Sequence, residues 1–209
     1  KHVDNGDEIV GIFLASKLSG TYQNAVLAAE MVGGAIYVID SQSATVVIAM
    51  QLEHALKLRG QGKNAKEIYQ EVNALKDRMR FIALIADLKY LRMGGRLSVT
   101  KALIATTMKI YPLATLFDGE ISIMATMRGE KKALKWLIEY MKNTDIDLQY
   151  GIHLGHSDSP EKCDKLRAML EKENFLVTAG LTESIGPTIG THVGPDLLGI
   201  VFVEKENNE

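Results

Sequence analysis

The sequence is almost free of cysteine. Cys163 is the one cysteine among 209 residues, so the chain cannot close an internal disulfide or supply the cysteine cluster of a structural zinc site. No apolar run reaches the roughly 18 residues that a membrane-spanning helix requires, and no charged-then-apolar leader opens the sequence. These absences predict a cytoplasmic protein that carries no metal and no cofactor.

An excess of charge of one sign is also missing. Lys and Arg number 24 and Asp and Glu number 26, for a formal net charge of −2, and the basic residues are scattered among the acidic ones. This balance argues against a nucleic-acid partner. With 46% hydrophobic and 24% charged residues, the composition is that of a globular chain that forms one large domain or two small ones.

Two common catalytic motifs are absent as well. No GxxxxGK[ST] sequence occurs, which disfavours nucleotide-driven phosphoryl transfer by this chain alone. The segment "SKLSGTY" lacks the glycine that stands two residues before the serine in a nucleophile elbow, which disfavours a serine hydrolase. We therefore assign no catalytic residue.

The first feature that is present is a polar turn between a strand and a helix. Residues 9–15, "IVGIFLA", are typical of a strand buried on both faces, and small apolar residues at helical spacing follow from Ala25. Between them lie Ser16, Ser19, Gly20 and Thr21. Ser19 could simply cap the helix, but the free N–H groups of a helix N-terminus also attract anions. Both interpretations stay open at this stage.

The first part of the chain alternates strands and helices. Strands are expected at residues 35–40 and 81–86, a helix at 44–60, and a second helix opening with a capping box at Asn64 and Glu67. Such alternation predicts parallel βαβ units. We assign residues 1–88 to a βαβ lobe.

The second part, residues 89–209, has a mixed pattern. An apolar helix is expected after residue 96, a hairpin turn at Asp118-Gly119, and a helix over residues 130–142. A further helix opens with Ser159 as cap and Pro160 in its first turn. We assign this part to an α+β lobe that shares one interface with the first lobe.

Three other places carry residues suited to binding. Arg96 follows Gly94-Gly95 and offers a planar cation for a carboxylate or phosphate, although an arginine after a turn is most often solvated. His192 stands in the glycine-rich segment "GPTIGTHVGPDLLG", where backbone can approach a ligand closely. His153 and His156 could form half of a metal site, but structural roles fit them better because no carboxylate triad is near.

Three segments together resemble a known family. "ASKLSGTYQNA", "LKYLRMGGR" and "IGPTIGTHVGPDLLG" match, in order, the signatures of the DegV family of bacterial fatty-acid-binding proteins, and the similarity extends from about Gly6 to Phe202. The resemblance implies an α/β, two-lobed DegV-like fold, with a parallel sheet in one lobe and a β-hairpin in the other. Family members begin about seventy residues earlier, so the resemblance implies that roughly the first seventy residues are lacking here.

The resemblance also implies a function. DegV proteins hold one long-chain fatty acid in a tunnel between their two lobes, which implies a ligand tunnel between residues 1–88 and 89–209 here. They act as the non-catalytic acyl carrier subunit of a bacterial fatty acid kinase, whose catalytic subunit phosphorylates the carboxylate to an acyl-phosphate. Carried over to this sequence, the carboxylate-binding residues are Ser19, Arg96 and His192, with Ser16, Gly20 and Thr21 nearby. The apolar residues of the segment 101–117 would line the acyl chain.

A partner-facing surface is expected as well. Arg128 together with Lys131 and Lys132 opens a helix with no evident acidic partner in the sequence, which suits contact with the kinase subunit, although a solvated charged face explains the pattern too. Transient contact with a membrane surface is compatible with lipid delivery. The alternative functions are an acyl- or phosphate-transfer enzyme and a sensor of a small anionic metabolite.

Overall fold

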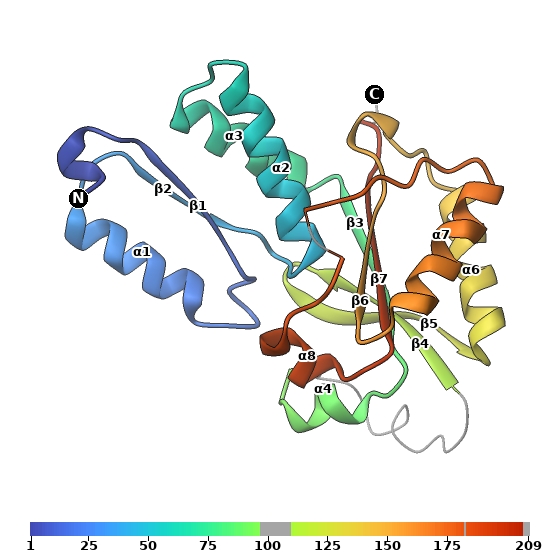
Figure 1. Cartoon of the computed structure of the whole chain (residues 1–209). Coiled ribbons are helices and arrows are strands. Elements are labelled where there is room, and N and C mark those ends of the chain that lie inside the picture. Colours follow the sequence, from blue (N-terminus) through green and yellow to red (C-terminus); the bar gives the residue numbers. More distant parts are fainter. Residues whose placement is uncertain (97–109, 182, 207–209) are drawn as a thin grey trace.

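The structure, a computed structural model, describes residues 1–96, 110–181 and 183–206 (Figure 1). The helix predicted after residue 96 lies outside these residues. In chain order the elements are the 3₁₀ helix η1 Val3–Asn5, β1 Ile9–Phe13, α1 Thr21–Val32, β2 Ile36–Asp40, α2 Val46–Gly60, α3 Ala65–Lys76, β3 Met79–Leu84, α4 Lys89–Met93, β4 Ile110–Phe117, β5 Glu120–Arg128, α6 Glu130–Lys142, the 3₁₀ helix η2 Leu148–Tyr150, β6 His153–Ser157, α7 Pro160–Lys172, α8 Pro187–Val193 and β7 Leu197–Val203.

The strands form two separate sheets. β1 and β2 pair in parallel, and β5, β4, β3, β7 and β6 form, in this order, an antiparallel sheet. The predicted α/β class is confirmed. The expectation that residues 81–86 continue a parallel βαβ arrangement is wrong, because β3 pairs antiparallel with both β4 and β7. The division at residue 88 stays a prediction, and it would put β3 in one part and its partner strands in the other.

The reason for this error lies in the burial of β3. Ile82 and Leu84 face the cluster under α6 and α7, whereas Phe81 and Ala83 pack on the opposite face of the sheet. A strand that is apolar on both faces has the same hydrophobic pattern in a parallel and in an antiparallel sheet. Periodicity alone therefore could not choose between them.

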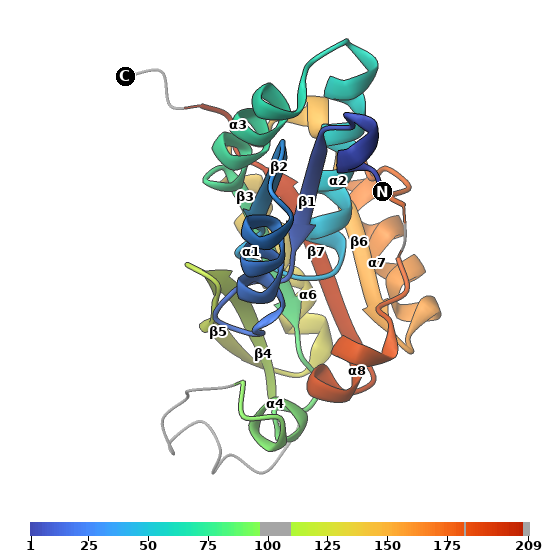
Figure 2. The same cartoon turned by 90° about the vertical axis from the view of Figure 1, so that its left-hand side faces the viewer.

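Helix α2 joins the two sheets (Figures 1 and 2). Its first turns pack Val46, Val47 and Met50 against β7, while Ala55 and Leu58 further along pack with α3 against β2. On the far face of the large sheet, α6 and α7 bury the largest apolar cluster. A helix buried on two sides explains why residues 44–60 show apolar residues nearly all round.

The structure contains several of the local features that the sequence predicts. The capping box at Asn64 and Glu67 is present with both hydrogen bonds, and Asp118 and Gly119, both at positive φ, form the turn of the β4–β5 hairpin. Ser159 holds the position before α7 and Pro160 its first turn, as predicted. The Ser159 hydroxyl, however, accepts no hydrogen bond from the N–H groups of α7; it donates to the Asp196 carboxylate (2.5 Å), a charge-assisted bond.

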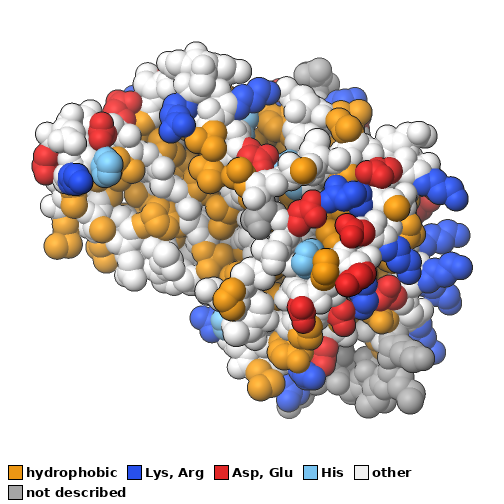
Figure 3. Space-filling model, viewed as in Figure 1, with side chains coloured by type: hydrophobic (Ala, Val, Ile, Leu, Met, Phe, Trp, Pro, Cys, Tyr) orange, Lys and Arg blue, Asp and Glu red, His pale blue; other side chains and the backbone are white. Residues whose placement is uncertain are grey.

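The region of α1, β1 and β2 has an apolar surface. Leu27, Met31 and Val32 of α1 are 56%, 88% and 63% exposed, and Figure 3 shows hydrophobic side chains over this side of the molecule. Within the described residues, no helix has the length and apolar character needed to cross a membrane.

Candidate ligand-binding site

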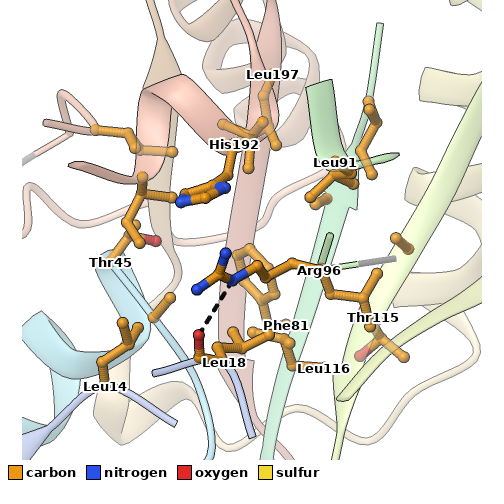
Figure 4. A pocket seen from close by; sticks show the side chains of 18 of the residues that line it. Leu14, Leu18, Thr45, Phe81, Leu91, Arg96, Thr115, Leu116, His192 and Leu197 are labelled. Atoms are coloured by element: carbon orange, nitrogen blue, oxygen red, sulfur yellow. Dashed lines mark hydrogen bonds between the residues drawn. The ribbon is translucent and has the colours of Figure 1, made fainter. Parts of the chain in front are cut away.

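A cavity of about 300 Å³ lies between the antiparallel sheet, α8, α4 and the loops at residues 14–19 and 44–45 (Figure 4). Most of its surface is apolar. Segments from five distant parts of the chain contribute side chains, including Leu14, Leu91, Ile121, Ile185, Ile189 and Leu197. Apolar walls with a few polar groups are typical of a small-molecule site.

The floor of the cavity comes from small residues in register across the sheet. Ala114 of β4 pairs with Ala83 of β3, Ala83 pairs with Gly199 of β7, and Gly199 pairs with Gly155 of β6. Residues directly opposite each other in antiparallel strands share one face of the sheet. The row therefore forms a shallow trough, and Ala83 and Ala114 line the cavity at one end of it.

Ser19 reaches the cavity from the turn between β1 and α1. Helix α1 begins at Thr21 with Gly20 as its N-cap residue, and the Ser19 hydroxyl accepts from the Thr21 N–H (3.3 Å) and bonds the Thr21 hydroxyl (2.7 Å). The turn itself is fixed by Asp40, whose carboxylate accepts from the Ser16 N–H (3.2 Å) and the Gln42 N–H (2.8 Å). Ser19 thus performs part of the capping role and still lines the cavity.

Arg96 lies across from this turn. Its Nε donates to the Leu18 carbonyl (3.3 Å) and its Nη1 to the Gly94 carbonyl (2.7 Å). The dashed line in Figure 4 marks the bond to Leu18. A guanidinium has five N–H donors, so these two bonds orient the fork, and its other donors have no partner among the residues that the structure describes. Arg96 therefore ties the β1–α1 turn to the α4 turn.

His192 comes from α8 and packs on the glycine turn after α4. A methyl group added at Gly94 would lie 2.1 Å from His192 Nδ1, and one added at Gly194 would lie 2.2 Å from the Tyr90 ring. Nδ1 is buried and has no hydrogen-bond partner within the described residues. Since His192 lines the cavity, Nε2 is the ring nitrogen that can reach a ligand.

A polar hollow of about 400 Å³ adjoins the cavity. Its lining shares Leu18, Ser19, Arg96 and Ile121 with the cavity and adds Ser16, Gly20, Gly95, Lys17 and Glu120. The structure thus brings Ser19, Arg96 and His192 to one cavity and places Ser16 and Gly20 at its polar side. Thr21 lines neither space and acts through its bond to Ser19.

Ser19, Arg96 and His192 lie in the three segments that resemble the DegV signatures. The family model described as "Uncharacterised protein, DegV family" matches residues 1–205. The chain belongs to the DegV family. A DegV domain-containing protein of Caldanaerobacter subterraneus is 39% identical over 201 residues, which cover 95% of this chain and 71% of that protein. A DegV domain-containing protein of Staphylococcus aureus is 33% identical over 205 residues, with 96% and 72% covered.

Solved structures of DegV proteins share the fold. A DegV lipid-binding protein from Thermotoga maritima matches with a TM-score of 0.81 at 27% identity, covering 97% of this chain and 72% of that one. A DegV family protein from Thermus thermophilus, described by its fatty acid binding, matches with a TM-score of 0.84 at 25% identity, with 95% and 71% covered. The resemblance seen in the sequence is therefore confirmed.

Sequence reasoning missed part of the cavity wall of this DegV chain. Phe81 and Ala83 of β3, Thr45 before α2 and Leu197 of β7 all line the cavity. The small residue Ala83 within the apolar strand "FIALIA" was the one sequence feature that could have indicated a cavity-lining position on β3. Of the apolar segment expected to line an acyl chain, residues 114–116 line the cavity, residues 110–113 and 117 do not, and residues 101–109 lie outside the described part.

His153 and His156 have structural contacts. His153 is buried, its Nε2 lies 3.5 Å from a Glu53 carboxylate oxygen, and burial lowers the pKa of its ring. His156 Nδ1 accepts from the Ser159 N–H (3.2 Å). Among the described residues, no group of three or more His, Cys, Asp or Glu side chains is arranged to hold a metal ion.

The expected partner surface is open to solvent. Arg128 ends β5, Lys131 and Lys132 lie in the first turn of α6, and all three are exposed. In the same turn Glu130 pairs with Lys162 (3.3 Å), whereas the three basic residues form no ion pair within the part of the chain that is described. Their charge is therefore available to a partner.

Proposed function

We propose that this DegV protein binds one long-chain fatty acid in the cavity and holds its carboxylate with Ser19, Arg96 and His192. The main observation behind this proposal is the shared cavity, in which hydrogen-bond donors from three distant segments line a mostly apolar wall. An ionised carboxylate only accepts hydrogen bonds, and a hydroxyl, a guanidinium and an imidazole N–H are all donors. The fatty-acid binding of the Thermus thermophilus relative supports the same ligand class.

The proposal requires a particular form of His192. A proton on Nδ1 would lie in the buried contact with Gly94 without an acceptor, whereas a proton on Nε2 can point at the ligand. The proposed bond to the carboxylate therefore needs a proton on Nε2. Gly94, which has no side chain, leaves the space in which the Nδ1 edge of the ring packs.

Affinity and orientation would come from different groups. Burial of the acyl chain contributes roughly 0.8 kcal/mol per methylene, and each hydrogen bond to the charged head group roughly 1.5–3 kcal/mol. The chain would supply most of the binding free energy, and the three donors would fix the carboxylate at the polar hollow. This arrangement suits a carrier that presents a carboxylate for reaction.

We propose further that the protein is a non-catalytic subunit. It would present the carboxylate to a fatty acid kinase in the cytoplasm for phosphorylation to an acyl-phosphate, with Arg128, Lys131 and Lys132 on the partner-facing surface. Transient contact with a membrane surface would allow loading and unloading. The exposure of these three basic residues supports a contact with a partner at the end of β5 and the start of α6.

Organic extraction of the full-length protein under denaturing conditions, followed by mass spectrometry, tests the ligand. Near-equimolar fatty acid is the expected result, and its absence would refute the proposal. Recovery of a phosphorylated metabolite would instead favour a sensor. Turnover of acyl-phosphate by the purified protein without any partner would favour a transfer enzyme.

A further inference from the structure

The trough of small residues extends beyond the cavity. Ala114 and Ala83 line the cavity, but the next positions of the row, Gly199 and Gly155, are covered by side chains. A methyl group at Gly199 would lie 3.0 Å from Cε2 of Phe81, and one at Gly155 would lie 2.6 Å from Cγ1 of Val46. The Phe81 ring therefore fills the trough directly beside the open part.

Phe81 also separates two different environments. Its ring packs against the apolar cluster at the cavity and against the cluster between α2 and β7. With Leu116 it lines both the cavity and a second hollow of about 460 Å³. In that hollow, Ser43 Oγ and Gln51 Oε1 are buried without a hydrogen-bond partner among the described residues. An acyl chain has no group that could form a hydrogen bond with these two oxygens, so the hollow is a poor site for it.

We propose that Phe81 ends the acyl-chain cavity and thereby determines which chain lengths the protein accepts. This inference rests on the proposed function. The cavity, about 300 Å³, is at the lower end of the range for small-molecule sites, so the space that one ring occupies is a large part of what a ligand can use. Without the ring, the trough over Gly199 would be open to the end of a longer chain.

Two substitutions should shift chain length in opposite directions. Phe81→Ala should favour longer saturated fatty acids, with affinity rising about fourfold for each methylene that enters the vacated space, the factor to which ~0.8 kcal/mol corresponds. Gly199→Ala adds a methyl group beneath the ring and, because backbone φ at this position is not positive, acts by pushing the ring toward the cavity. It should favour shorter chains.

The measurement is competition binding to the full-length protein with the saturated series from lauric to arachidic acid, alongside mass spectrometry of the lipid carried from bacteria. Phe175→Ala is a matched control, since that ring is partly buried against the cluster on the other face of the sheet. Phe81→Leu, a milder truncation, covers the case in which Phe81→Ala does not fold. The control should keep the wild-type preference.

The outcomes separate this inference from the proposed function. Wild-type protein without fatty acid would overturn both. Fatty acid in the wild type with an unchanged chain-length profile in Phe81→Ala and Phe81→Leu would overturn the inference alone. The same holds if the Gly199→Ala and Phe81 variants shift the profile in one direction, or if Phe175→Ala shifts it equally.

Discussion

Replacing Gly94 with alanine would place a methyl group in the space that the His192 ring occupies. The added carbon would lie 2.1 Å from Nδ1, well inside van der Waals contact. Gly94 has φ −74° and ψ −8°, which alanine adopts without strain. Any destabilisation by Gly94→Ala therefore reports on the contact with the imidazole and not on backbone strain.

The magnitude follows from two opposing effects. An alanine at a compatible glycine position stabilises a protein by about 0.4–1 kcal/mol, because the unfolded chain loses freedom. Overpacking a filled space costs about 1–3 kcal/mol. We expect a net loss of about 1–2 kcal/mol in the free energy of unfolding. Displacement of the ring should also remove one bond to the carboxylate and weaken fatty-acid binding roughly tenfold to a hundredfold.

The assay is urea unfolding of four proteins: wild type, Gly94→Ala, His192→Ala and the double variant. With the ring gone, the alanine at position 94 should lose its cost, which gives a coupling of about 1–3 kcal/mol between the two sites. Gly60→Ala is the matched control, since Gly60 ends α2 with nothing within 4 Å of an added methyl. Additive effects of the two substitutions, or a Gly94→Ala variant as stable as Gly60→Ala, would refute the packing of His192 on this glycine.

Three further results are expected. Ser19→Ala should reduce phosphorylation of the acyl group by the kinase more than it reduces lipid retention, because one head-group bond is lost while the apolar walls remain. Equal losses would contradict this, and Ser122→Ala, the same substitution at an exposed position of β5 outside the cavity lining, serves as control. Arg128→Ala should lower turnover with the kinase subunit and leave bound lipid unchanged, so that lost lipid would place Arg128 in the binding site instead. Burial, with the Glu183 carboxylate adding to it, raises the pKa of the Cys163 thiol to about 11, so iodoacetamide should label the folded protein slowly at neutral pH and faster as the pH rises. Labelling at neutral pH as fast as in denaturant would contradict the buried position.

The sequence by itself determined the local elements of this protein. Asn64 and Glu67 form their capping box within four residues, and Asp118-Gly119 turns the β4–β5 hairpin through backbone angles that glycine and aspartate tolerate. The glycines of the three motifs were also visible in the sequence, as were Ser19, Arg96 and His192. Short-range hydrogen bonds and allowed backbone angles depend on neighbours along the chain, so a single sequence contains them.

Only the tertiary structure decided which strands meet and what they enclose. β3 is apolar on both faces, so its antiparallel pairing with β7, more than a hundred residues away, could not be inferred from periodicity. The trough exists because Ala114, Ala83 and Gly199 fall into one register, and the role of Gly94 depends on a histidine brought against it by α8. Register and packing between distant segments are set by the combined burial of all the elements, which no local pattern specifies.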